Sequence, residues 1–90
     1  MKLNGSLDFN SVERLWKERK SFFADGVADL SSVDKIDSAG ISFLVLWSKE
    51  HEYRLKVINP PAEAINLIRL FKVSELFEIS ERSQQVKAEE

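Results

Sequence analysis

The feature that most constrains the fold is a regular alternation of short β-compatible runs with longer segments of helical periodicity. The β-compatible runs are 2–9, 27–33 and 54–61, and 74–79 is compatible with either a last strand or a helical turn. The helical segments between them are 8–26, 38–53 and 62–73. This order predicts an α/β fold with a mainly parallel or mixed sheet of about four strands and three to four helices packed mainly on one face. Residues 1–80 would form one small domain, and the polar segment 81–90 a mobile tail.

Local signals place the ends of the first helix and the faces of the second strand. Asn10 or Ser11 is suited to cap the first helix, which should run on to the Asp25-Gly26 pair. Alternation along the second strand puts Ala28 and Leu30 on one face and Val33 on the other. The second strand would therefore present apolar side chains to both sides of the sheet.

The sequence Asp37-Ser38-Ala39-Gly40 joins the second strand to an almost wholly apolar helix. Three interpretations compete for this junction: a helix cap, a nucleophile and a phosphorylatable recognition site. As a cap, Asp37 or Ser38 would satisfy free amides of the helix, an effect of about 1 kcal/mol. Gly40 would permit a tight turn or the close approach of another surface.

A nucleophilic role for Ser38 requires a base within hydrogen-bonding distance. The single histidine, His51, follows on the same predicted helix, roughly 20 Å away at about 1.5 Å per residue. The chain has no cysteine, and His51 has no second histidine at ligand spacing. We therefore expect no enzyme and no metal site, and the absence of a glycine-rich phosphate loop predicts no nucleotide cofactor.

Charge and hydropathy narrow the classes of partner. A net charge of −2 with interspersed signs argues against a nucleic-acid-binding surface. The longest apolar run, 40–47, is too short to span a membrane, and the N-terminal residues contain no apolar signal-peptide core. These features predict a cytoplasmic protein that acts by binding other proteins.

The helix after Gly40 is apolar on more than one face. Ile41, Leu44 and Val45 form its natural core stripe, whereas Phe43 and Trp47 point elsewhere at helical spacing. Complete burial of such a helix is difficult in a small domain, so Phe43 and Trp47 are candidates for a docking patch with Ser38. The alternative is that Trp47 caps the edge of the core or packs under another helix.

The combination of these segments resembles the STAS domain family. The strand 27–33, the Asp37-Ser38-Ala39-Gly40 junction, the apolar helix after it and the "LFKVSELFEI" ending carry the resemblance, which spans residues 3–80. In the MlaB-like branch of that family, the domain docks on the ATPase of an ABC transporter that moves phospholipid between bacterial membranes. In anti-sigma-factor antagonists, the matching hydroxyl is phosphorylated by a partner serine kinase.

The resemblance implies either an MlaB-like transport subunit or an anti-sigma-factor antagonist, and the transport subunit is favoured. This chain would be a non-catalytic subunit, cytoplasmic and peripheral to the inner membrane through the ATPase and its permease. Its contact residues would be Asp37, Ser38, Ala39, Gly40, Phe43 and Trp47. The alternative is an anti-sigma-factor antagonist that phosphorylation of Ser38 switches off; its Ala39 stands where such proteins more often carry a second hydroxyl. A structural domain without a dedicated partner is the third option.

Overall fold

The structure, a computed structural model, describes residues 1–80 of the chain. The expected mobile tail, 81–90, lies outside the described residues. Strands and helices alternate as the sequence predicts, in the order β1 (Lys2–Leu7), α1 (Phe9–Lys17), α2 (Arg19–Phe23), β2 (Val27–Ile36), α3 (Ser38–Lys49), β3 (Leu55–Ile58), α4 (Ala62–Leu70), the 3-10 turn η1 (Ser74–Leu76) and β4 (Phe77–Ser80). The segment 74–79 thus supplies both a helical turn and the last strand.

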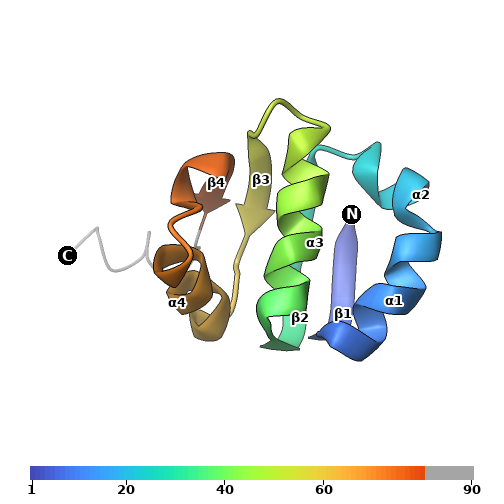
Figure 1. Ribbon diagram of the computed structural model, residues 1–90, viewed down its shortest axis with the longest axis horizontal. Coiled ribbons are helices and arrows are strands. Elements are labelled where there is room, and N and C mark those ends of the chain that lie inside the picture. The colour runs from blue at the N-terminus through green and yellow to red at the C-terminus, as the bar shows by residue number, and fades with distance from the viewer. Residues whose placement is uncertain (81–90) are drawn as a thin grey trace.

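The four strands form one sheet in the order β1-β2-β3-β4, and all three neighbouring pairs are parallel. Each connection crosses over through helix, and Figure 1 shows the helices together on one face of the sheet, with α3 between α1 and α4. The α/β class, the four strands and the one-sided helical layer are confirmed. Of the two sheet types expected, mainly parallel or mixed, the described residues form a wholly parallel sheet, because every crossover returns the chain in the same direction.

The second strand departs from simple alternation. Its pairing with β1 shifts in register twice, between Lys2 and Asn4 and again between Gly5 and Ser6. Extra residues of this kind rotate the side chains that follow to the opposite face. Val33 is consequently buried on the same side as Ala28 and Leu30, so the prediction that it faces the other side is wrong.

The first helix is capped two to three residues earlier than expected, so that it begins at Phe9. Asp8 is the N-cap: its carboxylate accepts a hydrogen bond from the Ser11 backbone amide, 3.0 Å away. The Ser11 hydroxyl in turn accepts from the Asp8 amide at 2.9 Å, which completes a reciprocal capping box. The predicted cap at Asn10 or Ser11 is therefore wrong, since Ser11 acts from inside the helix. The helical segment also breaks at Glu18, which separates α1 from α2.

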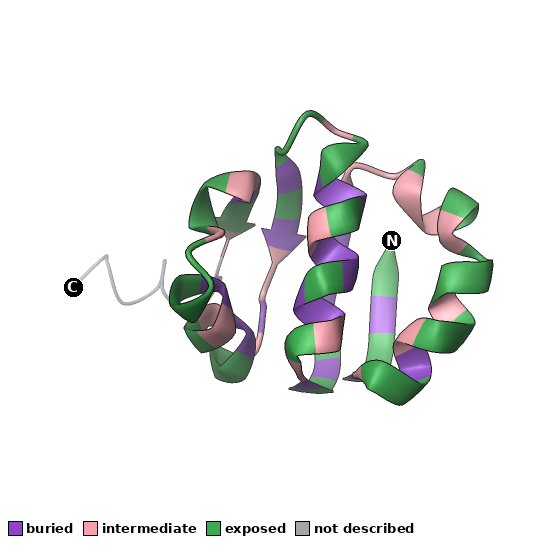
Figure 2. Ribbon diagram, in the orientation of Figure 1, coloured by how far each residue is buried: buried purple, intermediate pink, exposed green. Residues whose placement is uncertain are grey.

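The core lies between the sheet and the helical layer, and α3 supplies much of it. Phe43 and Trp47 are 1% and 0% exposed. Figure 2 shows buried residues repeating around α3, whereas the outward surfaces of α1 and α4 are exposed. Phe22 and Phe23 of α2 cover Phe43 and Trp47, with ring centroids 5.5–6.2 Å apart. The alternative that Trp47 packs under another helix is therefore confirmed, and Phe43 is buried beside it.

Candidate functional site

The junctions β1–α1 and β2–α3 meet at one edge of the sheet, the edge where the parallel strands end. In open α/β sheets, this edge is where connecting segments form binding sites. Each junction contains an aspartate that caps the following helix, Asp8 for α1 and Asp37 for α3. Two helix N-termini therefore open side by side on this edge, as the lower ends of α1 and α3 in Figure 1.

The side chain of Asp37 is fully engaged in holding these junctions. One carboxylate oxygen accepts hydrogen bonds from the amides of Ala39, at 2.9 Å, and Gly40, at 3.2 Å. The other accepts from the amide of Phe9, the first residue of α1, at 3.2 Å. The Asp37 amide donates to the Leu7 carbonyl at the end of β1. Of the two expected caps, Asp37 is the one that acts, and it also joins the two helix starts.

Gly40 explains why the helix can begin so close to the first strand. The residue is buried, and a methyl group at its position would collide with the Leu7 carbonyl oxygen. It would also approach Ile36 Cγ1 to 2.8 Å and Leu7 Cγ to 3.0 Å. Glycine is thus required for the close approach of α3 to the end of β1. The surface that approaches Gly40 belongs to the chain itself.

Ser38 is the one residue of the junction that is exposed. It is the first residue of α3, and within residues 1–80 its hydroxyl takes part in no hydrogen bond. Asp37 and Ala39 on either side of it are half-buried. The backbone around Ser38 is therefore fixed while its hydroxyl remains open to a partner, and the positive end of the helix dipole favours an anionic or acceptor group there.

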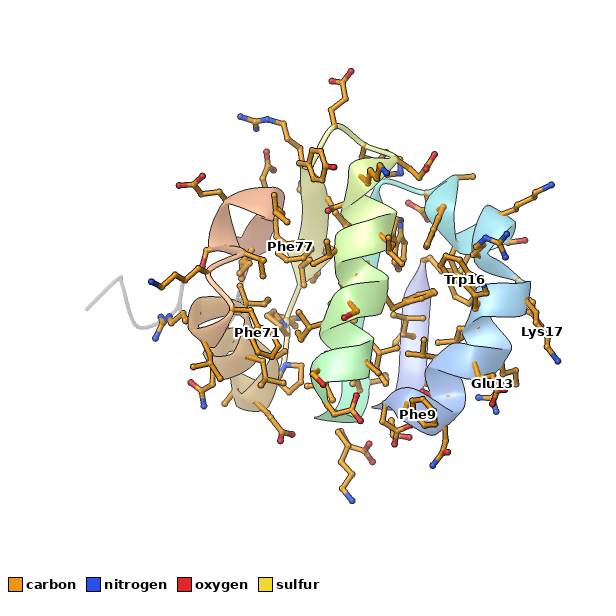
Figure 3. The ribbon with its side chains drawn as sticks, in the orientation of Figure 1. Phe9, Glu13, Trp16, Lys17, Phe71 and Phe77 are labelled. Carbon is orange, nitrogen blue, oxygen red and sulfur yellow. The ribbon has the colours of Figure 1, made fainter. Side chains whose placement is uncertain are left out.

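Phe9 is a second exposed side chain at this edge, and sequence reasoning missed it. It is 72% exposed, the most exposed of the large apolar side chains in the described residues. Its amide is bound to Asp37, which fixes its backbone beside the start of α3. Figure 3 shows Phe9 at the lower end of α1, away from Trp16 at the other end. An aromatic residue directly after a capping aspartate, where no core stripe has begun, was the available signal.

Phe43 and Trp47 do not belong to this edge. Both are enclosed in the core, and the Trp47 indole donates a hydrogen bond to the Asp25 carbonyl at 2.7 Å. The prediction that their side chains form a docking patch with Ser38 is therefore wrong. The physical reason is that α3 is covered on its flanks by α2 and α4 as well as by the sheet.

His51 lies beyond the far end of α3 and makes a specific contact there. The ring is half-buried, and its Nε2 lies 2.7 Å from the carbonyl oxygen of Phe23. This bond ties the end of α2 to the segment after α3, so His51 has a structural contact.

Two further observations bear on the chemistry open to this chain. Among residues 1–80, no three His, Cys, Asp or Glu side chains gather where they could hold a metal ion. No helix in this part of the chain has the length and apolar character needed to cross a membrane. At the edge around Asp8 and Asp37, the backbone amide of Ser11 holds the pKa of the Asp8 carboxyl below its ordinary value.

Comparison with protein families assigns the domain. A family model described as "Mlab, STAS domain" matches residues 1–78, which include every described strand and helix through the start of β4. The chain belongs to the MlaB-type STAS domain family. Comparison with curated proteins returned no match, and neither did comparison with solved structures.

STAS domains are generally non-catalytic domains that regulate or bind other proteins. In this STAS domain, the junction that carries the family resemblance is the edge described above, with Ser38 exposed and Asp37 and Gly40 engaged within the fold. The Ser38 hydroxyl is therefore accessible, while Asp37 and Gly40 fix the position of the backbone that carries it.

Proposed function

We propose that this STAS domain is a non-catalytic cytoplasmic subunit that docks on the ATPase of an ABC transporter. The transporter would move phospholipid between bacterial membranes and so maintain the lipid asymmetry of the outer membrane. The domain would support assembly or activity of the complex, peripheral to the inner membrane through its partner. The observation that carries the proposal is the exposed Ser38, next to an Asp37 that binds the amide of the exposed Phe9, in a domain that an MlaB-type family model matches.

The chemistry of the edge supports a protein partner. The Ser38 hydroxyl can both donate and accept a hydrogen bond, and no other group among the described residues uses it. Phe9 offers a large apolar side chain, and aromatic side chains are frequent anchors at interfaces. In this proposal Asp37, Ala39 and Gly40 contribute the shape of the edge, while Ser38 and Phe9 make the main side-chain contacts.

The partner is tested by purifying the tagged chain from its own cells and identifying the bound proteins by mass spectrometry. An ABC ATPase together with its permease supports the proposal. Affinity for the purified ATPase then tests the edge: Ser38→Ala should weaken binding modestly, and Ser38→Glu and Phe9→Ser should weaken it about tenfold or more. Ser21→Glu is the matched control, because Ser21 is an exposed serine on α2, away from this edge. Equal losses for Ser21→Glu and Ser38→Glu would contradict this docking surface.

A second function is favoured by the exposure of the same hydroxyl. A kinase could reach Ser38, and a phosphate there would lie at the positive end of the α3 dipole while repelling an acidic partner. The chain would then be an anti-sigma-factor antagonist with a serine kinase as partner. Recovery of such a kinase, together with phosphate on Ser38 in protein from the cells, would replace the transport proposal with this one.

A further inference from the structure

We propose that this domain has a second binding surface, a groove between α1–α2 and α3 that binds an acidic segment of a partner protein through an inserted apolar side chain. The groove is a hollow of about 410 Å³. The lining residues that matter here are Trp16, Arg19, Lys20, Phe23, Leu46 and Lys49. This surface goes beyond the edge around Ser38 and requires no particular partner there.

The floor of the groove is apolar and accessible. Trp16 is 39% exposed and Leu46 is 42% exposed, although each lies on a helix whose other apolar side chains reach the core. The half-buried ring of Phe23 lies below Trp16, with the two rings edge to face and their centroids 6.1 Å apart. An apolar side chain inserted here would remove Trp16 and Leu46 from water without any change in the fold.

The rim of the groove is positive on two sides. Arg19 and Lys20 stand on α2, and Lys49 stands on the last turn of α3. Glu50 is the only acidic residue of the lining, so the groove is positive in a chain whose net charge is −2. Positive charge on a negative molecule marks a local preference for an anionic partner.

One of these cations is already held in place. The guanidinium of Arg19 lies 4.3 Å from the centre of the Trp16 ring and donates a hydrogen bond to the Trp16 carbonyl at 2.8 Å. The cation–π contact fixes both side chains at the mouth of the groove. Binding of a carboxylate to Arg19 would therefore cost less side-chain conformational entropy than binding to an arginine that is free to rotate.

The arrangement favours a peptide segment over a single anionic group. Cations on α2 and on α3 flank the apolar floor from opposite sides, which matches an apolar residue with carboxylates before and after it in sequence. The volume is at the small end of the range for binding pockets, enough for side chains but not for a folded element. Lys49 lies about 16 Å along α3 from Ser38, so both surfaces can be occupied at once.

The experiment is a titration of the isotope-labelled chain followed by NMR. The probe is a short synthetic peptide with central leucine and phenylalanine residues flanked by glutamates. The chain has two tryptophans, and Trp16→Phe assigns their indole signals. We expect the Trp16 indole and the Leu46 amide to shift on binding, while the buried Trp47 indole and the amides around Ser38 stay in place. Binding should weaken with salt, because Lys20 and Lys49 on the rim are exposed.

Charge-reversal variants provide the decisive comparison. Lys20→Glu with Lys49→Glu should weaken peptide binding by about tenfold, whereas Lys35→Glu with Lys56→Glu, on the exposed side chains of β2 and β3, changes the net charge equally and should leave affinity within about twofold. Equal losses in the two double variants, equal binding of a lysine-flanked peptide, or no shift at millimolar peptide would overturn the proposal. Phosphatidylglycerol vesicles that shift the Trp16 signal where the peptide does not would do so as well. The ATPase measurement on Ser38 is independent of all these results.

Discussion

The carboxylate of Asp37 accepts a hydrogen bond from the backbone amide of Phe9, 3.2 Å away, and so joins the starts of α1 and α3. The two residues belong to different junctions of the sheet, yet this contact holds the backbone of Phe9, the most exposed aromatic residue, against the residue that precedes the exposed Ser38. The cap is therefore also the device that assembles the candidate binding edge.

Replacement of Asp37 should consequently affect both helices. Asp37→Ala removes the acceptor for three backbone amides, and we expect the free energy of unfolding to fall by about 2 kcal/mol, at the upper end for a cap. Urea denaturation measures this loss. Asp34→Ala, at an exposed position of β2, is the control and should stay within about 0.5 kcal/mol of the wild type. A loss at Asp37 no larger than at Asp34 would contradict the double role.

For Gly40→Ala, the informative result is whether the free energy of unfolding rises or falls. Inside an ordinary helix, alanine is about 1 kcal/mol more favourable than glycine. Here the added methyl group would collide with the Leu7 carbonyl and crowd Ile36, so we expect destabilisation by about 1–3 kcal/mol. Thermal or urea unfolding decides it, with Ser42→Ala at an exposed position of α3 as the control. A stabilised Gly40→Ala protein would show that α3 does not approach β1 this closely.

Much of this arrangement follows from local sequence, because caps and strand–helix alternation are local properties. The order of elements, a cap at Asp37 or Ser38, and a tight turn or close approach at Gly40 could be predicted in this way. Periodicity could not show that α3 lies in the middle of the helical layer, where α2 and α4 cover its flanks. That tertiary neighbourhood buries Phe43 and Trp47, which is why the predicted docking patch failed.

Two other differences have the same origin. Val33 faces the core because register shifts between β1 and β2 interrupt the alternation. No residue type within β2 indicates where these shifts occur. Phe9 became part of the candidate edge because Asp37, far away in sequence, binds its amide. Residues of the binding edge that depend on contacts between distant segments are those that the sequence could not reveal.

The burial of the two aromatic residues of α3 predicts large effects on stability. Phe43→Ala and Trp47→Ala should each lower the free energy of unfolding by about 3–5 kcal/mol, since they open cavities in the core. In a domain of this size, such losses approach the whole stability. Phe9→Ala is the matched control: the side chain is exposed, and the change should cost less than about 0.5 kcal/mol. Similar stability of all three variants in urea denaturation would contradict the core assignment.

Acid should weaken the fold through the carboxylates that bind backbone amides. The Ser11 amide lowers the pKa of Asp8, and the Ser31 amide lowers that of Asp29, from an ordinary value of 3.8. A lowered pKa in the folded state means that the ionised group stabilises the fold above pH 3.8 and that this contribution is lost as the pH falls through the folded-state pKa. The urea midpoint should therefore be steady near neutral pH and decline below about pH 4.

Asp8→Asn isolates the part of this decline that comes from the cap of α1. Asparagine is an equally good N-cap and keeps an oxygen for the Ser11 amide, but it carries no charge that acid can remove. We expect near-normal stability at neutral pH and a shallower decline in acid than in the wild type. Urea midpoints at a series of pH values measure the slope, and an NMR titration of the Asp8 carboxyl in the wild type gives its pKa directly. An unchanged slope in Asp8→Asn, or an Asp8 carboxyl that titrates at or above 3.8, would show that the Ser11 amide does not stabilise the charged cap.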